Sequence, residues 1–128
     1  MGTRTGYRAR GRIVVMPETY VPQRGDVVWV TMNPQAGHEQ TGRRPAVVLS
    51  PEAYNRRVGL AIFCPLTRQV KGYPFEVQIP SGLPASGAIL SDQVRSMDWR
   101  ARQAEKICEL PAAVIEEILQ KLHALLEL

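Results

Sequence analysis

The amino-acid sequence predicts a mainly β domain that ends in one amphipathic helix, which is an α+β fold class. Three observations lead to this prediction. Ten prolines and ten glycines among 128 residues favour short strands joined by tight turns. Several short runs are rich in β-branched and aromatic side chains. Near the C-terminus, apolar residues recur at a spacing of three to four.

Six segments have the composition of strands. Residues 46–50 and 60–66 are continuous apolar runs, as expected for strands buried on both faces. Residues 75–79 alternate apolar and polar side chains and should have one solvated face. A short helical turn is predicted over residues 51–57, with proline at its first position. The six predicted strands are residues 26–31, 46–50, 60–66, 75–79, 88–94 and 104–110.

The C-terminal segment has the clearest pattern in the chain. Pro111 suits the first turn of a helix, and Glu116 and Glu117 lie near the positive end of its dipole. A helix of about four turns should pack its apolar side on the sheet. His123 is expected at the surface of this helix or in its packing. The apolar positions are Val114, Ile115, Ile118, Leu119, Leu122, Leu125 and Leu126.

The net charge of +4 is unevenly distributed. Residues 1–17 carry four arginines and no acid, have little to bury, and are expected to form a disordered basic arm. Residues 18–128 are then the folded domain, in which basic and acidic side chains balance. Within it, residues 39–75 hold six basic and two acidic side chains. Such a surface suits a polyanion, although a solvated rim would have the same composition.

Composition excludes several classes of protein. A hydrophobic content of 45% and a charged content of 22% are close to globular averages. No apolar run approaches the roughly 20 residues of a membrane span, and no signal peptide is recognisable, so a cytoplasmic location is expected. Cys64 and Cys108 each lie in an apolar run and are expected to be free thiols rather than a disulfide.

The motifs of most catalytic sites are absent from the sequence. There is no GxxxxGK loop, no CxxC pair, no HExxH and no acidic cluster of the two-metal nuclease type. We therefore expect no metal and no other cofactor. The only histidines, His38 and His123, are 85 positions apart, and His123 lies in the predicted packing helix. A histidine-pair ribonuclease is thus weakly supported.

Two polar loops, residues 33–43 and 67–74, carry groups suited to RNA chemistry. RNA can be cleaved by its own 2′-OH, which needs a base for that proton, cations for the phosphorane charge and a proton donor for the leaving oxygen. Glu39 in the first loop can be the base, and Arg44 just after it offers a planar fork of donors to phosphate. In the second loop, Thr67 can supply a hydroxyl and Lys71 a point charge. Ordinary surface polar residues are the alternative interpretation.

Four segments of the chain resemble the MazF/PemK ribonuclease toxins. They stand in the order and spacing of that family and span residues 20–99. Each segment alone would be a weak signal, but four in register make a specific match. The segments read YVPQRGDVVWV, NPQAGHEQTGRRPAVVLSPEAYN, CPLTRQVKGYPFEV and AILSDQVRSMDW.

The resemblance implies a small SH3-like barrel of the CcdB/PemK type that is active as a homodimer. It implies sequence-selective, metal-independent cleavage of single-stranded mRNA to a 2′,3′-cyclic phosphate and a 5′-OH. A MazE-like antitoxin would inhibit the enzyme by occupying its RNA groove. The catalytic residues of the family fall on Glu39, Arg44 and Thr67. The residues expected to bind RNA are Gln40, Arg43, Arg68, Lys71, Tyr73, Asp92 and Gln93.

Several of these residues have two interpretations. Tyr73 either stacks on a base or caps the sheet. Asp92 and Gln93 either line the groove or are structural. Trp29 and Trp99 are both interpreted as core packing.

Two features depart from the family pattern. His38, next to the predicted base, is either solvated or tunes proton transfer in its loop. The basic arm over residues 1–15 has no counterpart in short members of the family. It either adds salt-sensitive phosphate contacts or has no role in RNA binding.

Two other functions are compatible with the same barrel. A CcdB-like toxin binds a gyrase subunit without cutting nucleic acid, and a nonspecific RNA-binding barrel binds RNA without cleaving it. Neither function requires Glu39, Arg44 and Thr67 together.

Overall fold

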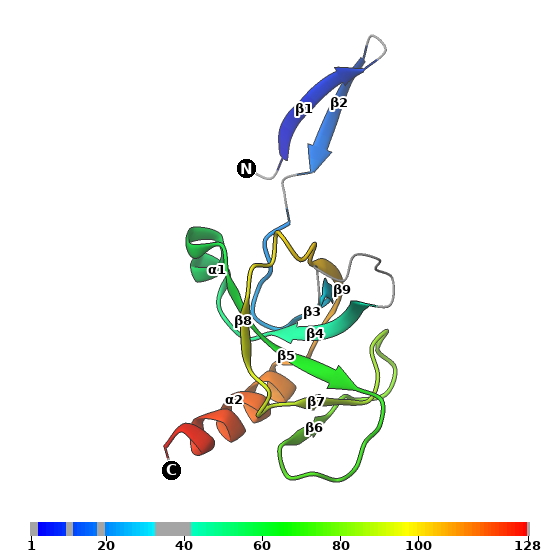
Figure 1. The fold of residues 1–128 in the computed structure, drawn as a ribbon. Helices are drawn as coiled ribbons and strands as arrows, with labels where there is room; N and C mark the ends of the chain where they lie inside the picture. The colour runs from blue at the N-terminus through cyan, green and yellow to red at the C-terminus, as the bar shows by residue number, and fades with distance from the viewer. Residues whose placement is uncertain (1–2, 10–11, 18–19, 33–41, 128) are drawn as a thin grey trace.

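The computed structural model describes residues 3–9, 12–17, 20–32 and 42–127. A seven-stranded antiparallel sheet carries the C-terminal helix α2 (Ala112–Leu126) on one side (Figure 1). The strand order is β6–β7–β5–β4–β3–β9, and β8 also pairs with β5. This confirms the predicted α+β class. The strands are β3 (Asp26–Thr31), β4 (Arg43–Val48), β5 (Ala61–Thr67), β6 (Glu76–Gln78), β7 (Ala88–Leu90), β8 (Arg95–Met97) and β9 (Glu105–Glu109).

The predicted strands are present, with differences that have local causes. β4 begins earlier than predicted because Arg43 pairs with Thr31 at the end of β3. The segment 88–94 was predicted as one strand, but β7 ends at Leu90, where the Gln93 N–H donates to the Leu90 carbonyl in a turn. The chain then leaves its pairing with β6 and forms β8 against β5.

The short predicted helix is α1 (Glu52–Val58). Pro51 is its N-cap residue in an extended conformation, rather than the first helical residue as predicted. Proline still suits this place because the first turn of a helix leaves its N–H groups without intrahelical partners.

The segment expected to be a disordered arm contains two strands. β1 (Thr3–Ala9) and β2 (Arg12–Pro17) pair antiparallel as a two-stranded sheet of their own (Figure 1). The consecutive β-branched residues 13–15 favour an extended backbone, although the segment as a whole has few apolar side chains. The division of the chain into an arm over 1–17 and a domain over 18–128 remains a prediction.

Buried apolar side chains form a cluster on each side of the sheet. Alternation along β3 sends Val27 to one cluster and Val28 and Val30 to the other, and β4 is divided in the same way. β4 is thus buried on both faces, as its continuous apolar run predicted. The helix side holds Val27, Val47, Leu49, Cys64, Val77, Ile79, Ala85, Ile89, Leu110, Val114, Ile115 and Ile118. The opposite side holds Val28, Val30, Ala46, Val48, Ala61, Phe63, Met97 and Trp99.

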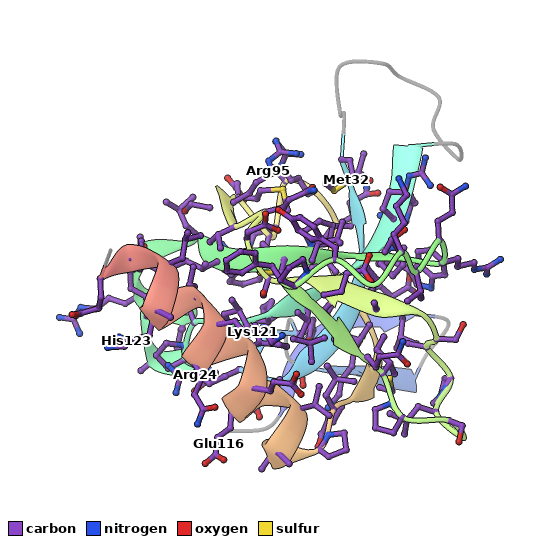
Figure 2. The ribbon with its side chains drawn as sticks, turned by 90° about the horizontal axis from the view of Figure 1, so that it is seen from below. Arg24, Met32, Arg95, Glu116, Lys121 and His123 are labelled. Carbon is purple, nitrogen blue, oxygen red and sulfur yellow. The ribbon has the colours of Figure 1, made fainter. Side chains whose placement is uncertain are left out.

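The two cysteines and the surface of α2 agree with the expectations from the sequence. Cys64 is buried and Cys108 is half-buried, and both are free thiols. Burial raises the pKa of the Cys64 thiol to about 12. Glu116, Lys121 and His123 lie along α2 (Figure 2), and His123 is exposed. Within the described ranges, no helix is long and apolar enough to cross a membrane.

Candidate active site

A cleft of about 550 Å³ opens where β4 begins and β5 ends. Three of its lining residues are arginines and none is acidic, so its electrostatic potential suits a polyanion. Apolar side chains from β3, β4, β5 and β9 form much of the rest. The lining residues are Trp29, Arg43, Arg44, Pro45, Leu66, Thr67, Arg68, Gln69, Pro84, Ala85, Ser86 and Ile107.

The pairing of β4 with β5 brings Arg44 and Thr67 to this cleft together. Ala46 pairs with Pro65 in the antiparallel register. Beyond this last recorded pair, Arg44 and Thr67 each lie two residues further along their strand, and both line the cleft. Two of the three predicted catalytic residues, separated by 23 positions in the sequence, are therefore neighbours in the fold.

Local hydrogen bonding orients the hydroxyl of Thr67. Its Oγ1 accepts a hydrogen bond from the backbone N–H of Gln69 at 3.1 Å. Because that bond uses the oxygen only as an acceptor, the hydroxyl proton remains available for a substrate oxygen. Thr67 is half-buried and lies at the last position of β5, so its backbone is fixed by the sheet.

The backbone of Thr67 also depends on a close approach by Gly87. A Cβ atom at position 87 would lie 2.1 Å from the Thr67 carbonyl oxygen, and Gly87 has a φ of +102°. A side chain there would push the end of β5 away from β7. Glycine is therefore needed at this position both for space and for backbone conformation.

We expect Gly87→Ala to destabilise the protein by about 3 kcal/mol, through the left-handed backbone and the collision with Thr67. The matched control is Gly82→Ala, since Gly82 has a φ of +93° with no atom within 4 Å of its Cβ position. Urea unfolding of both variants measures the difference. Equal losses of unfolding free energy would show that the approach to Thr67 costs nothing.

The first arginine of β4 is held by protein groups. The Arg43 guanidinium donates to Thr31 Oγ1 at 3.0 Å and to the Gln103 carbonyl at 3.0 Å. It also forms an ion pair with Glu105 at 3.3 Å. Arg43 was predicted to bind RNA, and although it lines the cleft, these contacts give it a structural function at the end of the sheet.

The loop between β5 and β6 is fastened by the carboxylate of Glu76. This group accepts hydrogen bonds from the backbone N–H of Lys71 at 3.1 Å and of Gly72 at 3.0 Å. Lys121 of α2 donates to the carbonyl of Pro74 at 2.6 Å. The loop thus has a defined conformation, and Arg68 at its start lines the cleft.

Four residues predicted to bind RNA lie outside the lining of this cleft: Lys71, Tyr73, Asp92 and Gln93. The Tyr73 hydroxyl donates to Asp92 Oδ2 at 2.6 Å, and this hydrogen bond raises the pKa of Tyr73. The other oxygen, Asp92 Oδ1, is buried without a hydrogen-bond partner in the described part of the chain. Tyr73 and Asp92 therefore join the loop to the end of β7, which supports their structural interpretation.

Trp29 is a residue of the site that the sequence did not reveal. Trp99 is buried, as expected of a core residue, but the Trp29 side chain is 40% exposed and lines the cleft. The interpretation of Trp29 as core packing is wrong because Trp29, although on the same face of β3 as Val27, pairs with Pro45 beyond the helix-side cluster. Predicting the exposure of Trp29 would have required the register between β3 and β4, which a single sequence does not provide.

The predicted base Glu39, its neighbour Gln40 and His38 lie outside the described residues. Among the residues that are described, no group of three or more His, Cys, Asp or Glu side chains is placed to hold a metal ion.

Residues 23–126 match the model of the PemK-like, MazF-like toxins of type II toxin–antitoxin systems. The chain belongs to this family. It is 46% identical to the endoribonuclease toxin MazF of Escherichia coli K12 over 111 aligned residues. The alignment covers 87% of this chain and 99% of that protein. The endoribonuclease PemK of Escherichia coli is 32% identical and covers 81% of each chain.

Solved structures of the family have the same fold. MazF from Deinococcus radiodurans is 55% identical, with a TM-score of 0.77 over 85% of this chain and 99% of that one. A MazE–MazF structure from the same organism gives 50% identity and a TM-score of 0.76 over 84% of this chain and 96% of that one. The family predicted from four sequence segments is thereby confirmed.

Proposed function

We propose that this chain is the toxin of a type II toxin–antitoxin pair and an endoribonuclease that cuts single-stranded mRNA at selected sequences. The reaction is transesterification by the 2′-OH, without a metal, and leaves a 2′,3′-cyclic phosphate and a 5′-OH. The observation that supports this most directly is the meeting of Arg44 and Thr67 in one cationic cleft. Two relatives in the family, MazF and PemK of Escherichia coli, are named endoribonucleases.

Each step of this reaction has a candidate residue in the chain. Glu39 takes the proton of the 2′-OH as the 2′-oxygen attacks phosphorus. The Arg44 guanidinium donates to the phosphorane oxygens with its planar fork, and Arg68 adds positive charge at the same cleft. The bond from phosphorus to the 5′-oxygen then breaks, the Thr67 hydroxyl donates a hydrogen bond to that leaving oxygen, and a proton from solvent completes the 5′-OH.

The antitoxin and the assembly follow from the same proposal. A MazE-like antitoxin occupies the cationic cleft and excludes RNA. Support for such a partner comes from the MazE–MazF structures of the Deinococcus relative. The active form is a homodimer, and its place of action is the cytoplasm, where mRNA is available. Of the predicted RNA contacts outside the cleft, Lys71 keeps an exposed side chain that can meet the RNA backbone.

The test is incubation of the purified protein with a long single-stranded RNA in EDTA, followed by mapping of both ends of each product. We expect discrete cuts with 5′-OH and 2′,3′-cyclic phosphate ends. A matched RNA with a 2′-deoxyribose at the cleaved nucleotide should remain intact, because it lacks the nucleophile.

Other outcomes of this test favour other functions. Intact RNA in a buffer where a related MazF is active, together with binding of the RNA, would favour a nonspecific RNA-binding barrel. Intact RNA with no binding would favour a CcdB-like toxin, for which binding to a gyrase subunit is the next measurement.

Trp29 is expected to stack on a base of the bound RNA. Its indole is exposed and lines the same cleft as Arg44 and Thr67, and stacking on an aromatic side chain contributes about 1–3 kcal/mol per base. Trp29→Ala should therefore raise the Kd for the 2′-deoxy RNA about tenfold, whereas Trp29→Phe should retain most of the affinity. Fluorescence anisotropy measures both. An unchanged Kd for the alanine variant would contradict the stacking.

A further inference from the structure

The turn between β8 and β9 is built to hold one residue, Arg102, in place. Asp98 Oδ1 accepts hydrogen bonds from the N–H groups of Arg100 at 3.1 Å and Ala101 at 2.9 Å. The Arg102 N–H donates to the Asp98 carbonyl at 3.0 Å. Gln103 follows with a φ of +54°, a left-handed conformation that is uncommon for a residue with a side chain. Such a backbone persists only where surrounding contacts determine it.

Arg102 takes the place of a strand partner at the end of β3. β9 begins at Glu105, opposite Trp29, so Thr31 lies beyond the last pair of these two strands. The Thr31 N–H donates to the Arg102 carbonyl at 3.0 Å. The Arg102 guanidinium, through Nη1, donates to the Thr31 carbonyl at 3.0 Å and to the Met32 carbonyl at 2.7 Å.

The same turn also holds the beginning of β4. Arg43 donates to the carbonyls of Arg102 and Gln103, at 3.4 and 3.0 Å, and to Thr31 Oγ1. The Met32 N–H donates to the Gly42 carbonyl at 2.8 Å, which closes the pairing between the two chain segments. Both strand ends are thereby joined to one turn that belongs to neither.

These contacts end one residue away from Arg44. Arg44 pairs with Val30 inside the β3–β4 ladder and faces the cleft, whereas Arg102 is half-buried and is not among the residues that line it. Arg102 therefore reaches the cleft only through the strand ends that it holds. In a displacement reaction, an error of about 1 Å in a phosphate-binding group can reduce the rate about 100-fold.

We propose that Arg102 is a positioning residue for RNA cleavage, which holds the paired ends of β3 and β4 and so fixes the Arg44 guanidinium relative to the reacting phosphate. This inference rests on the proposed ribonuclease function. Arg102 does not touch the RNA. Without the Arg102 side chain, the carbonyls of Thr31 and Met32 would have no hydrogen-bond partner from β9. Loss of this side chain therefore loosens the ends of β3 and β4 and removes no contact with the RNA.

The test compares Arg102→Ala with Arg100→Ala, which removes the same charge from the same turn. The Arg100 guanidinium lies over the Trp99 ring at 4.8 Å, and Arg100 is exposed. In single-turnover cleavage well below the Tm of each variant, Arg102→Ala should be slowed by roughly 10- to 100-fold and Arg100→Ala should match wild type. The Kd for the 2′-deoxy RNA should be the same for both variants. Arg102→Lys should recover part of the rate, because an ammonium can reach one of the carbonyls.

A double-mutant cycle separates positioning from a general effect on the fold. If Arg102 acts through Arg44, the rate loss caused by Arg102→Ala should largely vanish in an Arg44→Lys background. An equal loss in both backgrounds would overturn the proposal, as would a rate for Arg102→Ala equal to that of Arg100→Ala. If the alanine variant does not fold, Arg102→Lys is put through the same cycle with the same criterion. A wild-type protein that does not cleave RNA would instead remove the proposed function, and this inference with it.

Discussion

Arg44→Ala is expected to lower the single-turnover rate of RNA cleavage about 1,000-fold, the largest effect that we expect of any single substitution. Arg44 lines a cleft that contains three arginines and no acid. Its planar fork can donate two hydrogen bonds to two oxygens of the phosphorane, where charge develops in the transition state. Its side chain is exposed, so the substitution should leave the Tm close to that of wild type.

Two further variants show whether fork geometry or charge is responsible. Arg44→Lys keeps the charge and loses the fork, and should recover only part of the rate. Arg57→Ala removes an equal charge from α1, which contributes no residue to the cleft lining, and should cleave at the wild-type rate. A rate for Arg44→Ala within about tenfold of wild type would contradict its function in charge stabilisation, since donors of this kind contribute about 100-fold or more.

The strands could be predicted where burial alone determines them. The run predicted at residues 46–50 is apolar as far as Leu49 because β4 is covered on both faces, and at that length the pattern favours a strand over a helix. The segment 88–94 could not be divided correctly. Its turn depends on tertiary hydrogen bonds, such as that from Ser91 Oγ to the carbonyl of Phe75 at 2.6 Å, which a single sequence does not reveal.

The chemistry of the candidate site could be predicted from the sequence, but which residues line it could be predicted only in part. Arg43 and Arg44 are adjacent in sequence, and residue type cannot tell which faces a ligand. Both line the cleft, but pairing with β3 separates them, since the Arg43 guanidinium bonds to Thr31 and to the turn before β9, whereas Arg44 pairs with Val30 and has an exposed side chain. Trp29, whose aromatic character had suggested a core position, is exposed because its pair with Pro45 lies beyond the helix-side cluster.

Residues remote in sequence from Arg44 and Thr67 also shape the site, and the sequence did not predict them. Arg102 and Gly87 carry no catalytic signature, yet the first holds the strand ends beside Arg44 and the second allows β7 to approach Thr67. Both act through backbone carbonyls, which are common to all residues. Contacts of this kind are visible only in three dimensions.

Thr67→Val is expected to lower the cleavage rate about 100-fold, because valine has the shape of threonine without the hydroxyl that donates to the leaving oxygen. The substitution also removes the acceptor for the Gln69 N–H, so loss of the local turn is a competing explanation. Thr67→Ser distinguishes the two, since serine keeps both the donor and the acceptor and should retain most of the activity. A serine variant as slow as the valine variant would mean that the methyl group or the backbone, not the hydroxyl, matters. Full activity of the valine variant would assign the proton donor to another group, and Lys71 would be the next to test.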